Sequence, residues 1–312
     1  MRIVVALGGN AILKRGDRGT IAQQRAAVRE ACEELAVLAA GNELVVTHGN
    51  GPQVGRLMLQ DEAMPDALPR FPLDVHVAET QGQLGYLIQQ ELSAALVRAR
   101  DPRPVVTLVT QVVVDAGDPG FIRPTKPVGP HLSKKGAAEY RARGVPIAEV
   151  PGGGWRRVVA SPEPVAIVEA GTIRALADAG AVPIAAGGGG VPVVRDGSGV
   201  RGVAAVIDKD LTAAVLARAV GADALLIVTD VDAVYRKFGT DDAEPISMLR
   251  AADARAGVED GTFARGSMAE KVLAAAAAAE AGMRAVITSL GRGREALAGE
   301  AGTRVVLDEE IS

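Results

Sequence analysis

Two lysines stand at predicted helix starts, where a cation is unfavourable. Lys209 lies between two aspartates, and Lys271 follows a capping-box pattern at Ser267–Glu270. A cation near a helix N-terminus opposes the helix dipole by about 0.3–1 kcal/mol. An anion bound between the lysine and the helix end would remove that cost. These lysines therefore predict a phosphate site; the alternative is a pair of solvated lysines balanced by the neighbouring carboxylates.

Lysine is also scarce in this chain, which makes a third position notable. Only seven of the 34 basic residues are lysines, so arginine is the usual cation. Lys126 lies in the proline-rich stretch "RPTKPVGP", whose three prolines make it rigid. We expect the remaining four lysines to be solvated: Lys14, Lys134, Lys135 and Lys237.

Three glycine-rich turns follow predicted strands: Gly8–Asn10, Gly49–Gly51 and Gly187–Gly190. Pro52 suits a first helical position, so the second turn predicts strand, turn and helix N-terminus. Free N–H groups at such a helix start bind anions. Because the carboxyl ends of parallel strands meet at one edge of a sheet, we expect the three turns to line one crevice for a small anion. The four glycines at 187–190 also suggest a close backbone approach to a ligand, or a hinge.

Aspartates flank the same predicted elements. Asp208 and Asp210 could orient the lysines or support Mg²⁺, and Asp230 with Tyr235 could form the wall of a nucleotide pocket after the strand "ALLIVT". Helix capping and turn formation are the ordinary alternative for aspartate. We expect His48, beside the second turn, to cap the loop rather than to act on a ligand.

Several function classes are excluded by missing patterns. The chain has no G-x-x-x-x-G-K-[ST], no G-x-G-x-x-G after the first strand, no protein-kinase signature and no G-x-S-x-G elbow. The single Cys32 excludes an intrachain disulfide and a cysteine-based metal site, and the three histidines lack metal-type spacing. A net charge of −4 without basic runs argues against nucleic acid, and no apolar stretch approaches a membrane span. We expect a cytoplasmic protein.

Short apolar runs alternate with helical periodicity along the 312 residues. This order predicts an α/β fold with a mostly parallel sheet and helices on both faces. With 48% hydrophobic and 3% aromatic residues, the core must be built from Val, Leu, Ile and Ala. One strand is expected within 104–114, from "PVVTLVTQVVV". Helices are expected near 20–40, 75–100, 169–179, 211–220 and 267–281.

Residues 115–160 interrupt this rhythm with many prolines and glycines. A structureless loop of that length is uncommon inside a compact domain, so we interpret it as an inserted lobe or lid. We place a lobe boundary at the glycine quartet, which gives an N-terminal lobe of 1–186 and a C-terminal lobe of 187–312.

The motifs together resemble the amino acid kinase family, and within it the carbamate kinase branch. The resemblance runs from residue 3 to about 290, through "VVALGGNAIL", "THGNGPQVG", "TQVVVD", "PTKPVGP", "GWRRVVASPEP", "GGGGVPVV", "VIDKDL", "ADALLIVTDVDAVY" and "GSMAEKV". Other branches usually have a lysine near the first glycine turn. Here Asn10 stands there, and Lys126 could supply that charge.

The resemblance implies a three-layer α/β/α sandwich with a central, mainly parallel sheet and a protruding insert subdomain. It implies reversible phosphoryl transfer between ATP and carbamate, giving ADP and carbamoyl phosphate, with Mg²⁺ through unspecified ligands, in a homodimer, with a place in arginine metabolism. The N-terminal lobe would bind carbamate and the C-terminal lobe the nucleotide. The implied catalytic residues are Lys209, Lys271, Lys126, Asp208 and Asn10. Substrate would contact Gly8, Gly9, Gly49, Asn50 and Gly51, and nucleotide would contact Asp230, Tyr235, Gly266, Ser267 and Met268.

Three alternatives stay open. A kinase for another small acid would share this fold, although we identify no extra recognition groups near Gly49–Gly51. A non-catalytic nucleotide or anion sensor is a second alternative, and both Lys209 and Lys271 argue against it. A dehydrogenase is the third, and it lacks its phosphate fingerprint.

Overall fold

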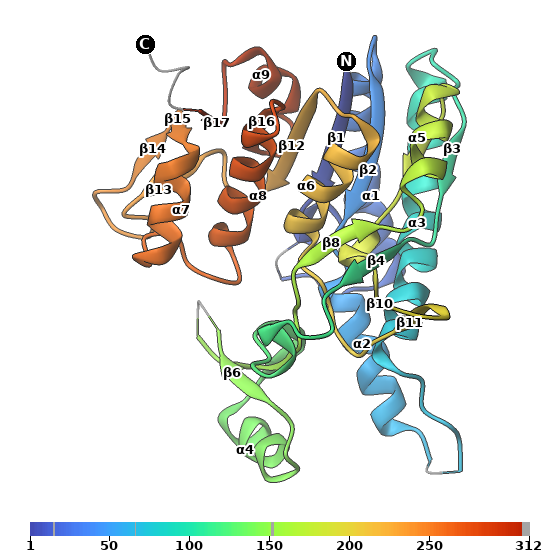
Figure 1. Ribbon diagram of the computed structural model, residues 1–312, viewed down its shortest axis with the longest axis vertical. Helices are drawn as coiled ribbons and strands as arrows, with labels where there is room; N and C mark the ends of the chain where they lie inside the picture. Colours follow the sequence, from blue (N-terminus) through green and yellow to red (C-terminus); the bar gives the residue numbers. More distant parts are fainter. Residues whose placement is uncertain (15, 66, 151–152, 308–312) are drawn as a thin grey trace.

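The computed structural model describes residues 1–14, 16–65, 67–150 and 153–307, and leaves the side chain of Asn10 undescribed. Its centre is an eight-stranded sheet in the order β15-β17-β16-β12-β1-β2-β9-β3 (Figure 1). Every pairing in it is parallel except that of β16 with β17, so the predicted mainly parallel sheet is confirmed. The strands are β1 (Arg2–Leu7), β2 (Glu43–His48), β3 (Val105–Thr107), β9 (Val182–Ile184), β12 (Ala224–Thr229), β15 (Met248–Arg250), β16 (Arg284–Ser289) and β17 (Thr303–Val306).

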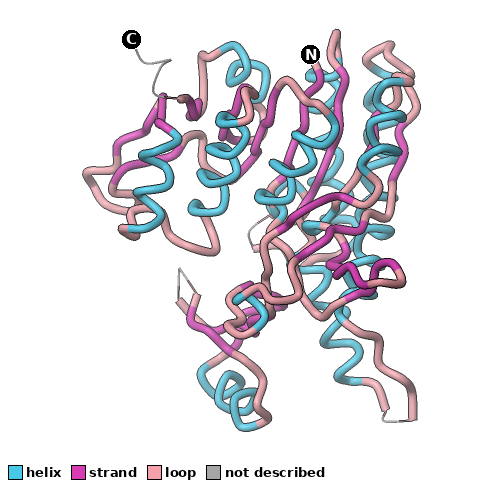
Figure 2. The backbone as a smooth tube through the Cα atoms, in the orientation of Figure 1, coloured by secondary structure: helices cyan, strands magenta, loops and turns pink. Residues whose placement is uncertain are grey.

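Helices cover both faces of this sheet, as predicted (Figure 2). Residues of β1 alternate between two apolar cores: Ile3 and Val5 belong to one, Val4 and Ala6 to the other. This is the period of two that a strand buried on both faces must show. The first core includes residues of α1 (Ile21–Ala39), α3 (Leu73–Arg98) and α9 (Gly293–Ala298). The second includes residues of α5 (Ala170–Asp178), α6 (Lys209–Val220), α7 (Ala251–Glu259) and α8 (Met268–Glu280).

The predicted single strand within 104–114 is wrong. The chain leaves the main sheet after β3 and enters a second sheet, of order β11-β10-β4-β8. At the junction, the backbone N–H of Thr110 donates to Gln81 Oε1 over 2.8 Å, and the N–H of Ala186 donates to Thr110 Oγ1 over 3.0 Å. These bonds to side chains interrupt the backbone hydrogen bonds between strands. An apolar run in the sequence does not indicate such an interruption. The second sheet contains β4 (Gln111–Val114), β8 (Pro164–Ile167), β10 (Val191–Asp196) and β11 (Gly199–Gly202).

The Pro/Gly-rich stretch forms a small structure that protrudes from the body (Figure 1). It has a three-stranded sheet in the order β5-β7-β6 and one α-helix. It packs on α2 (Gly51–Ala63) so closely that a Cβ on Gly55 would lie 2.0 Å from Gly129 Cα. Its elements are η2 (Pro119–Phe121), β5 (Lys126–Leu132), α4 (Lys134–Ala142), β6 (Ile147–Glu149) and β7 (Trp155–Val159). The lid role and the lobe boundary at 186/187 stay predictions.

The starts of α1, α6 and α8 differ in the side chains that bind the N–H groups of the first turn. A capping box of Thr20 and Gln23 begins α1, close to the predicted start at 20. Helix α6 begins at Lys209, before the predicted 211, because the Asp208 carboxylate accepts the N–H groups of Asp210 and Leu211. At α8 the predicted capping box is wrong: Ser267 makes no side-chain cap, and Glu270 Oε1 instead accepts the N–H of Gly266 over 2.9 Å.

The remaining described elements are a hairpin and two short 3-10 helices. The hairpin β13 (Val234–Arg236) with β14 (Glu244–Ile246) extends the C-terminal half, and η1 (Gly9–Ala11) and η3 (Gly187–Gly189) follow β1 and β9. Cys32 is buried as a free thiol. Among the helices of the described ranges, none has the length and apolar character needed to cross a bilayer.

Candidate active site

Three lysines from three elements meet at two aspartates. Lys126, which opens β5 in the insert, pairs with Asp208, although 82 positions separate them. Lys209 and Lys271 share Asp210: Lys209 contacts Oδ1, and Lys271 Nζ lies 3.0 Å from Oδ2. The capping position of Asp208 and the first turn of α6 place both carboxylates here. Lys126, Lys209 and Lys271, each expected at the site, therefore lie together.

Burial sets the charge states within this cluster. For Lys126 and Lys271, burial works to lower the pKa, but the carboxylates of Asp208 and Asp210 outweigh it and the pKa of each is raised. For Lys209, the effect of burial is larger than the attraction of the Asp210 carboxylate. The positive charge of Lys271 acts in the same direction as burial, so the pKa of Lys209 is lowered. The side chain of Lys209 is only 12% exposed. Lys209 is thus the cation in the cluster that loses its proton most readily, unless an anion binds beside it.

Each lysine keeps hydrogen-bond donors for a ligand. An ammonium group has three N–H donors. Bonds to described atoms use one at Lys126, one at Lys209 and two at Lys271, whose second acceptor is the Ser267 carbonyl at 3.2 Å. A phosphate or carboxylate oxygen can therefore be added without breaking the ion pairs.

The first two glycine turns adjoin Lys209. A Cβ placed on Gly49 would lie 3.5 Å from Lys209 Cδ and 4.0 Å from the backbone nitrogen of Gly9. The N–H groups of Gly9 and Gly51 have no partner within the described residues, because each precedes the repeating bonds of η1 or α2. Gly8 has less free space around it, since a Cβ added there would lie 2.7 Å from the carbonyl oxygen of Val228. Open amides and a buried cation thus converge, as a small anion requires.

The third glycine turn packs closely against other parts of the chain, and its expected approach to a ligand stays a prediction. Gly187–Gly190 are all buried, and Cβ atoms there would strike the chain itself rather than open space. A Cβ on Gly187 would lie 2.4 Å from His48 Nε2, and one on Gly188 2.0 Å from Asn50 Nδ2. Gly187 and Gly188 therefore allow the side chains of His48 and Asn50 to pack closely on this turn. The three turns do follow adjacent strands β1, β2 and β9, as predicted.

His48 and the Asn50 side chain are consequently structural. His48 is 1% exposed, its Nδ1 lies 3.0 Å from the Gly49 carbonyl, and burial lowers its pKa to about 4. It is neutral at physiological pH, in agreement with the loop-capping role. Asn50 donates from Nδ2 to Thr80 Oγ1 over 2.8 Å, so its amide group is already engaged by α3.

The residues predicted for the nucleotide are arranged less tightly. Asp230 is exposed and lines a hollow of about 340 Å³ with Gly8, Thr229 and Ser289, beyond the ends of β1, β12 and β16. Lys14 also lines that hollow and pairs with Glu30. Gly266 and Ser267 are exposed at the start of α8, and Met268 is half-buried.

Tyr235 lies on β13 and donates to Asp232 Oδ1 over 2.7 Å. Its ring is half-buried and lies 6.0 Å, centroid to centroid, from that of Phe238. The side chain of Asn10, predicted as catalytic, lies outside the described residues; its backbone is part of η1.

Glu270 is a site residue that the sequence reasoning treated only as a cap. Its Oε2 is buried and has no hydrogen-bond partner among the described residues, and its charge helps to raise the pKa of Lys126 and of Lys271. Its position one residue before Lys271 was the available signal. Across the described ranges, no three His, Cys, Asp or Glu side chains form a cluster suited to a metal ion.

Comparison with known proteins assigns the family. The model of the amino acid kinase family matches residues 1–289. A carbamate kinase of Halobacterium salinarum is 49% identical over 313 residues, and one of Thermococcus kodakarensis 45% over 311, each comparison covering 98% of this chain and 99% of the relative. Carbamate kinase from Giardia lamblia bound to citric acid superposes with a TM-score of 0.92 at 39% identity over 98% of both chains, and its form bound to AMP-PNP with 0.88. This chain belongs to the amino acid kinase family, in its carbamate kinase branch.

Proposed function

We propose that this chain catalyses reversible phosphoryl transfer between ATP and carbamate, giving ADP and carbamoyl phosphate. One observation carries this: Lys126, Lys209 and Lys271 converge on two aspartates beside the open amides of Gly9 and Gly51. The described residues of the site offer cations and N–H donors. Relatives named carbamate kinase, one of them bound to AMP-PNP, support this choice of substrates.

The proposed mechanism is positioning with charge stabilisation. Carbamate already carries a charged oxygen, so the reaction needs no general base, which agrees with the neutral, buried His48. The amides at Gly49–Gly51 would hold carbamate, and those at Gly8–Asn10 would hold the transferring phosphoryl group. Lys209 and Lys271 would stabilise the charge that gathers on its oxygens in an in-line transfer.

Asp208 and Asp210 would act through the lysines. Each carboxylate is already engaged by an ammonium group, and Asp208 is also bound by two backbone N–H groups of α6. Asp208 therefore positions Lys126, while Asp210 holds Lys209 and Lys271 together. Because Lys126 belongs to the protruding insert, movement of the insert would carry this lysine to or from the phosphoryl group. This is the proposed lid role.

Mg²⁺ would enter with the nucleotide. In kinases this ion keeps several waters and binds substrate phosphates with only one or two carboxylates. The buried, unpartnered Oε2 of Glu270 is the protein oxygen suited to such a contact. When bound, the ion neutralises charge on the phosphate oxygens.

The nucleotide contacts, assembly and location are part of the same proposal. The nucleotide would lie in the C-terminal lobe, against Asp230, Tyr235 and the start of α8 at Gly266–Met268.

A homodimer is supported by apolar side chains exposed at 11-residue spacing along α3, which places them on one face of the helix: Val75, Tyr86 and Val97. The cytoplasm, where ATP and ADP are available, is the proposed location.

The test is ATP formation by the purified protein from ADP, Mg²⁺ and carbamoyl phosphate, followed by luminescence. We expect rapid synthesis that depends on the protein and on carbamoyl phosphate. Acetyl phosphate and glutamyl phosphate serve as alternative donors. Synthesis with one of these and none with carbamoyl phosphate would identify a kinase for another small acid. Binding of ADP without transfer from any donor would identify a nucleotide sensor.

A further inference from the structure

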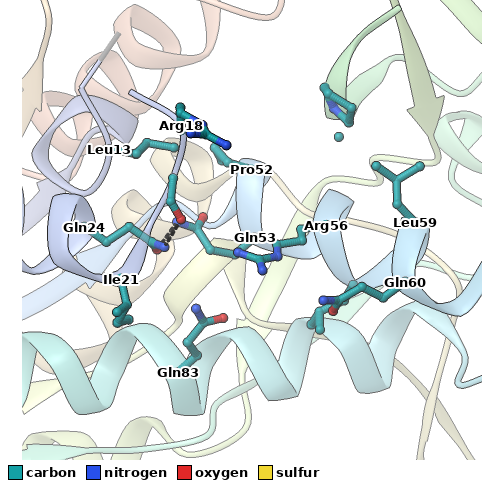
Figure 3. A pocket seen from close by; sticks show the side chains of 14 residues that line it. Leu13, Arg18, Ile21, Gln24, Pro52, Gln53, Arg56, Leu59, Gln60 and Gln83 are labelled. Carbon is teal, nitrogen blue, oxygen red and sulfur yellow. Dashed lines mark hydrogen bonds between the residues drawn. The ribbon is translucent and has the colours of Figure 1, made fainter. Parts of the chain in front are cut away.

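A second large cavity shares no lining residue with the lysine cluster. It has a volume of about 530 Å³ and opens between the segment before α1, the first two turns of α2, the middle of α3 and Gly129–Pro130 of the insert (Figure 3). None of the residues that line it is a lysine or an aspartate of the candidate active site. Its volume falls within the range of cavities that hold small organic ligands.

The walls of this cavity are positively charged. Arg18 and Arg56 both line it, and neither forms an ion pair or hydrogen bond within the described ranges. Among its lining residues in the described part of the chain, none is Asp or Glu. Two unpaired guanidinium groups on one cavity favour an oxyanion, because guanidinium binds carboxylate or phosphate through paired N–H donors.

Amide side chains complete the polar lining. Gln60 and Gln83 line the cavity and make no hydrogen bond within the described residues, so their N–H₂ groups are available as donors. Figure 3 shows Gln60 beside Arg56, with Gln83 on the neighbouring helix. Such donors can bind the oxygens that the guanidinium groups leave unfilled.

Gln53 requires a different partner. It is 6% exposed, and its Nε2 donates to Gln24 Oε1 over 2.8 Å (Figure 3). Its Oε1 is buried and has no hydrogen-bond partner in the part of the chain that the structure describes. A buried, unpartnered carbonyl oxygen costs free energy, so it indicates a missing donor. Because the last side-chain torsion of glutamine is soft, a small rotation brings this oxygen to a hydroxyl in the cavity that Gln53 lines.

We propose that this cavity is a second ligand site, which binds a small organic oxyanion that also has a hydroxyl group. Arg18 and Arg56 bind the carboxylate or phosphate, Gln60 and Gln83 donate to its remaining oxygens, and Gln53 Oε1 accepts from the hydroxyl. The apolar side chains of Leu13, Ile21 and Leu57 cover a short carbon skeleton. The site does not depend on the proposed phosphoryl transfer.

The experiment is isothermal titration of the whole protein with two hydroxylated probes, L-malate and glycerol 3-phosphate, which separate a carboxylate from a phosphate ligand. At least one probe is expected to bind with a Kd below about 10 mM. In the double variant Arg18→Gln/Arg56→Gln, affinity for that probe is expected to fall about tenfold or more, the scale of losing charge-assisted hydrogen bonds. Arg195→Gln, at an exposed position on β10, is the matched control and keeps wild-type affinity.

Three outcomes would overturn the proposal. The first is the absence of binding by either probe. The second is unchanged affinity in a double variant that still melts as the wild type does. The third is binding that Lys209→Ala abolishes and the double variant retains, because the anion would then occupy the lysine cluster. The hydroxyl contact is tested in the wild type, where succinate should bind more weakly than L-malate; equal affinities would remove Gln53 from the site.

Discussion

Two sets of glycines follow neighbouring strands of the same sheet and serve opposite purposes. Gly9 and Gly51 have no atom within 4 Å of an added Cβ, and their N–H groups have no partner among the described residues. Gly187–Gly190 lie one strand away and are buried against His48, Asn50, Ile207 and Val112. The first set leaves space for a ligand, and the second lets the protein chain pack closely on itself.

The comparison shows how a glycine's role is decided. Glycine can be required because a ligand approaches, because a side chain approaches, or because φ is positive. At Gly188 the last two apply together, with φ at +67° and Asn50 2.0 Å from an added Cβ. At Gly51 neither does. Substitutions should therefore separate the sets: the buried set should affect folding, and the open set should affect catalysis.

The largest effect is expected for Gly188→Ala. A left-handed backbone costs an alanine about 1–2 kcal/mol, and overpacking against Asn50 adds about 1–3 kcal/mol. The free energy of unfolding, measured by urea denaturation, should fall by about 2–5 kcal/mol. Gly82→Ala is the control, because Gly82 lies within α3 with no atom near an added Cβ. That change should stabilise the protein slightly. Equal stability of the two variants would contradict the packing role of the quartet.

The next effect concerns the cation beside the open set. Lys209→Ala should lower kcat about 10²-fold, the scale of losing one preorganised electrostatic group. Folding should persist, because Asp210 keeps its ion pair with Lys271. Lys135→Ala is the control, since the Lys135 side chain is 89% exposed. A folded Lys209→Ala enzyme with wild-type kcat would exclude Lys209 from the mechanism.

The pH dependence sharpens this prediction. Burial lowers the pKa of Lys209 from its ordinary 10.5, so raising the pH discharges it before Lys126 or Lys271, whose pKa values are raised. Since kcat/KM reports the free enzyme, it should fall on the alkaline side with a midpoint below 10.5. In Lys209→Arg the cation persists to higher pH, and the fall should move with it. An alkaline fall at the same pH in both proteins would assign it to another group.

The smallest effect is expected for Gly51→Ala. The methyl group meets no protein atom, so the free energy of unfolding should change by no more than about 0.5 kcal/mol. The methyl would, however, stand beside the N–H groups proposed for carbamate, and KM for carbamoyl phosphate should rise about three- to tenfold. Gly171→Ala in α5, which is equally open, is the control. If both variants had wild-type KM, the anion would not bind at the second turn.

The elements that local patterns specify were predictable. The strands β1, β2, β12 and β16 follow from apolar runs, and the start of α1 from the capping box of Thr20 and Gln23. Apolar runs predict strands because both faces are buried, and the box predicts a helix start because its bonds close within four residues. The break at Thr110 could not be predicted in this way, since its hydrogen bonds come from Gln81 and Ala186.

The sequence by itself determined the chemistry available to this protein: scarce lysines beside aspartates, and glycines at strand ends that leave N–H groups free. The tertiary structure decided which of these residues meet. It pairs Lys126 with Asp208 across 82 positions, joins Lys209 and Lys271 at Asp210, and buries the glycine quartet on His48 and Asn50. Residue types and short-range bonds are local properties of a chain, whereas proximity between distant residues exists only after the sheet has brought its strand ends together.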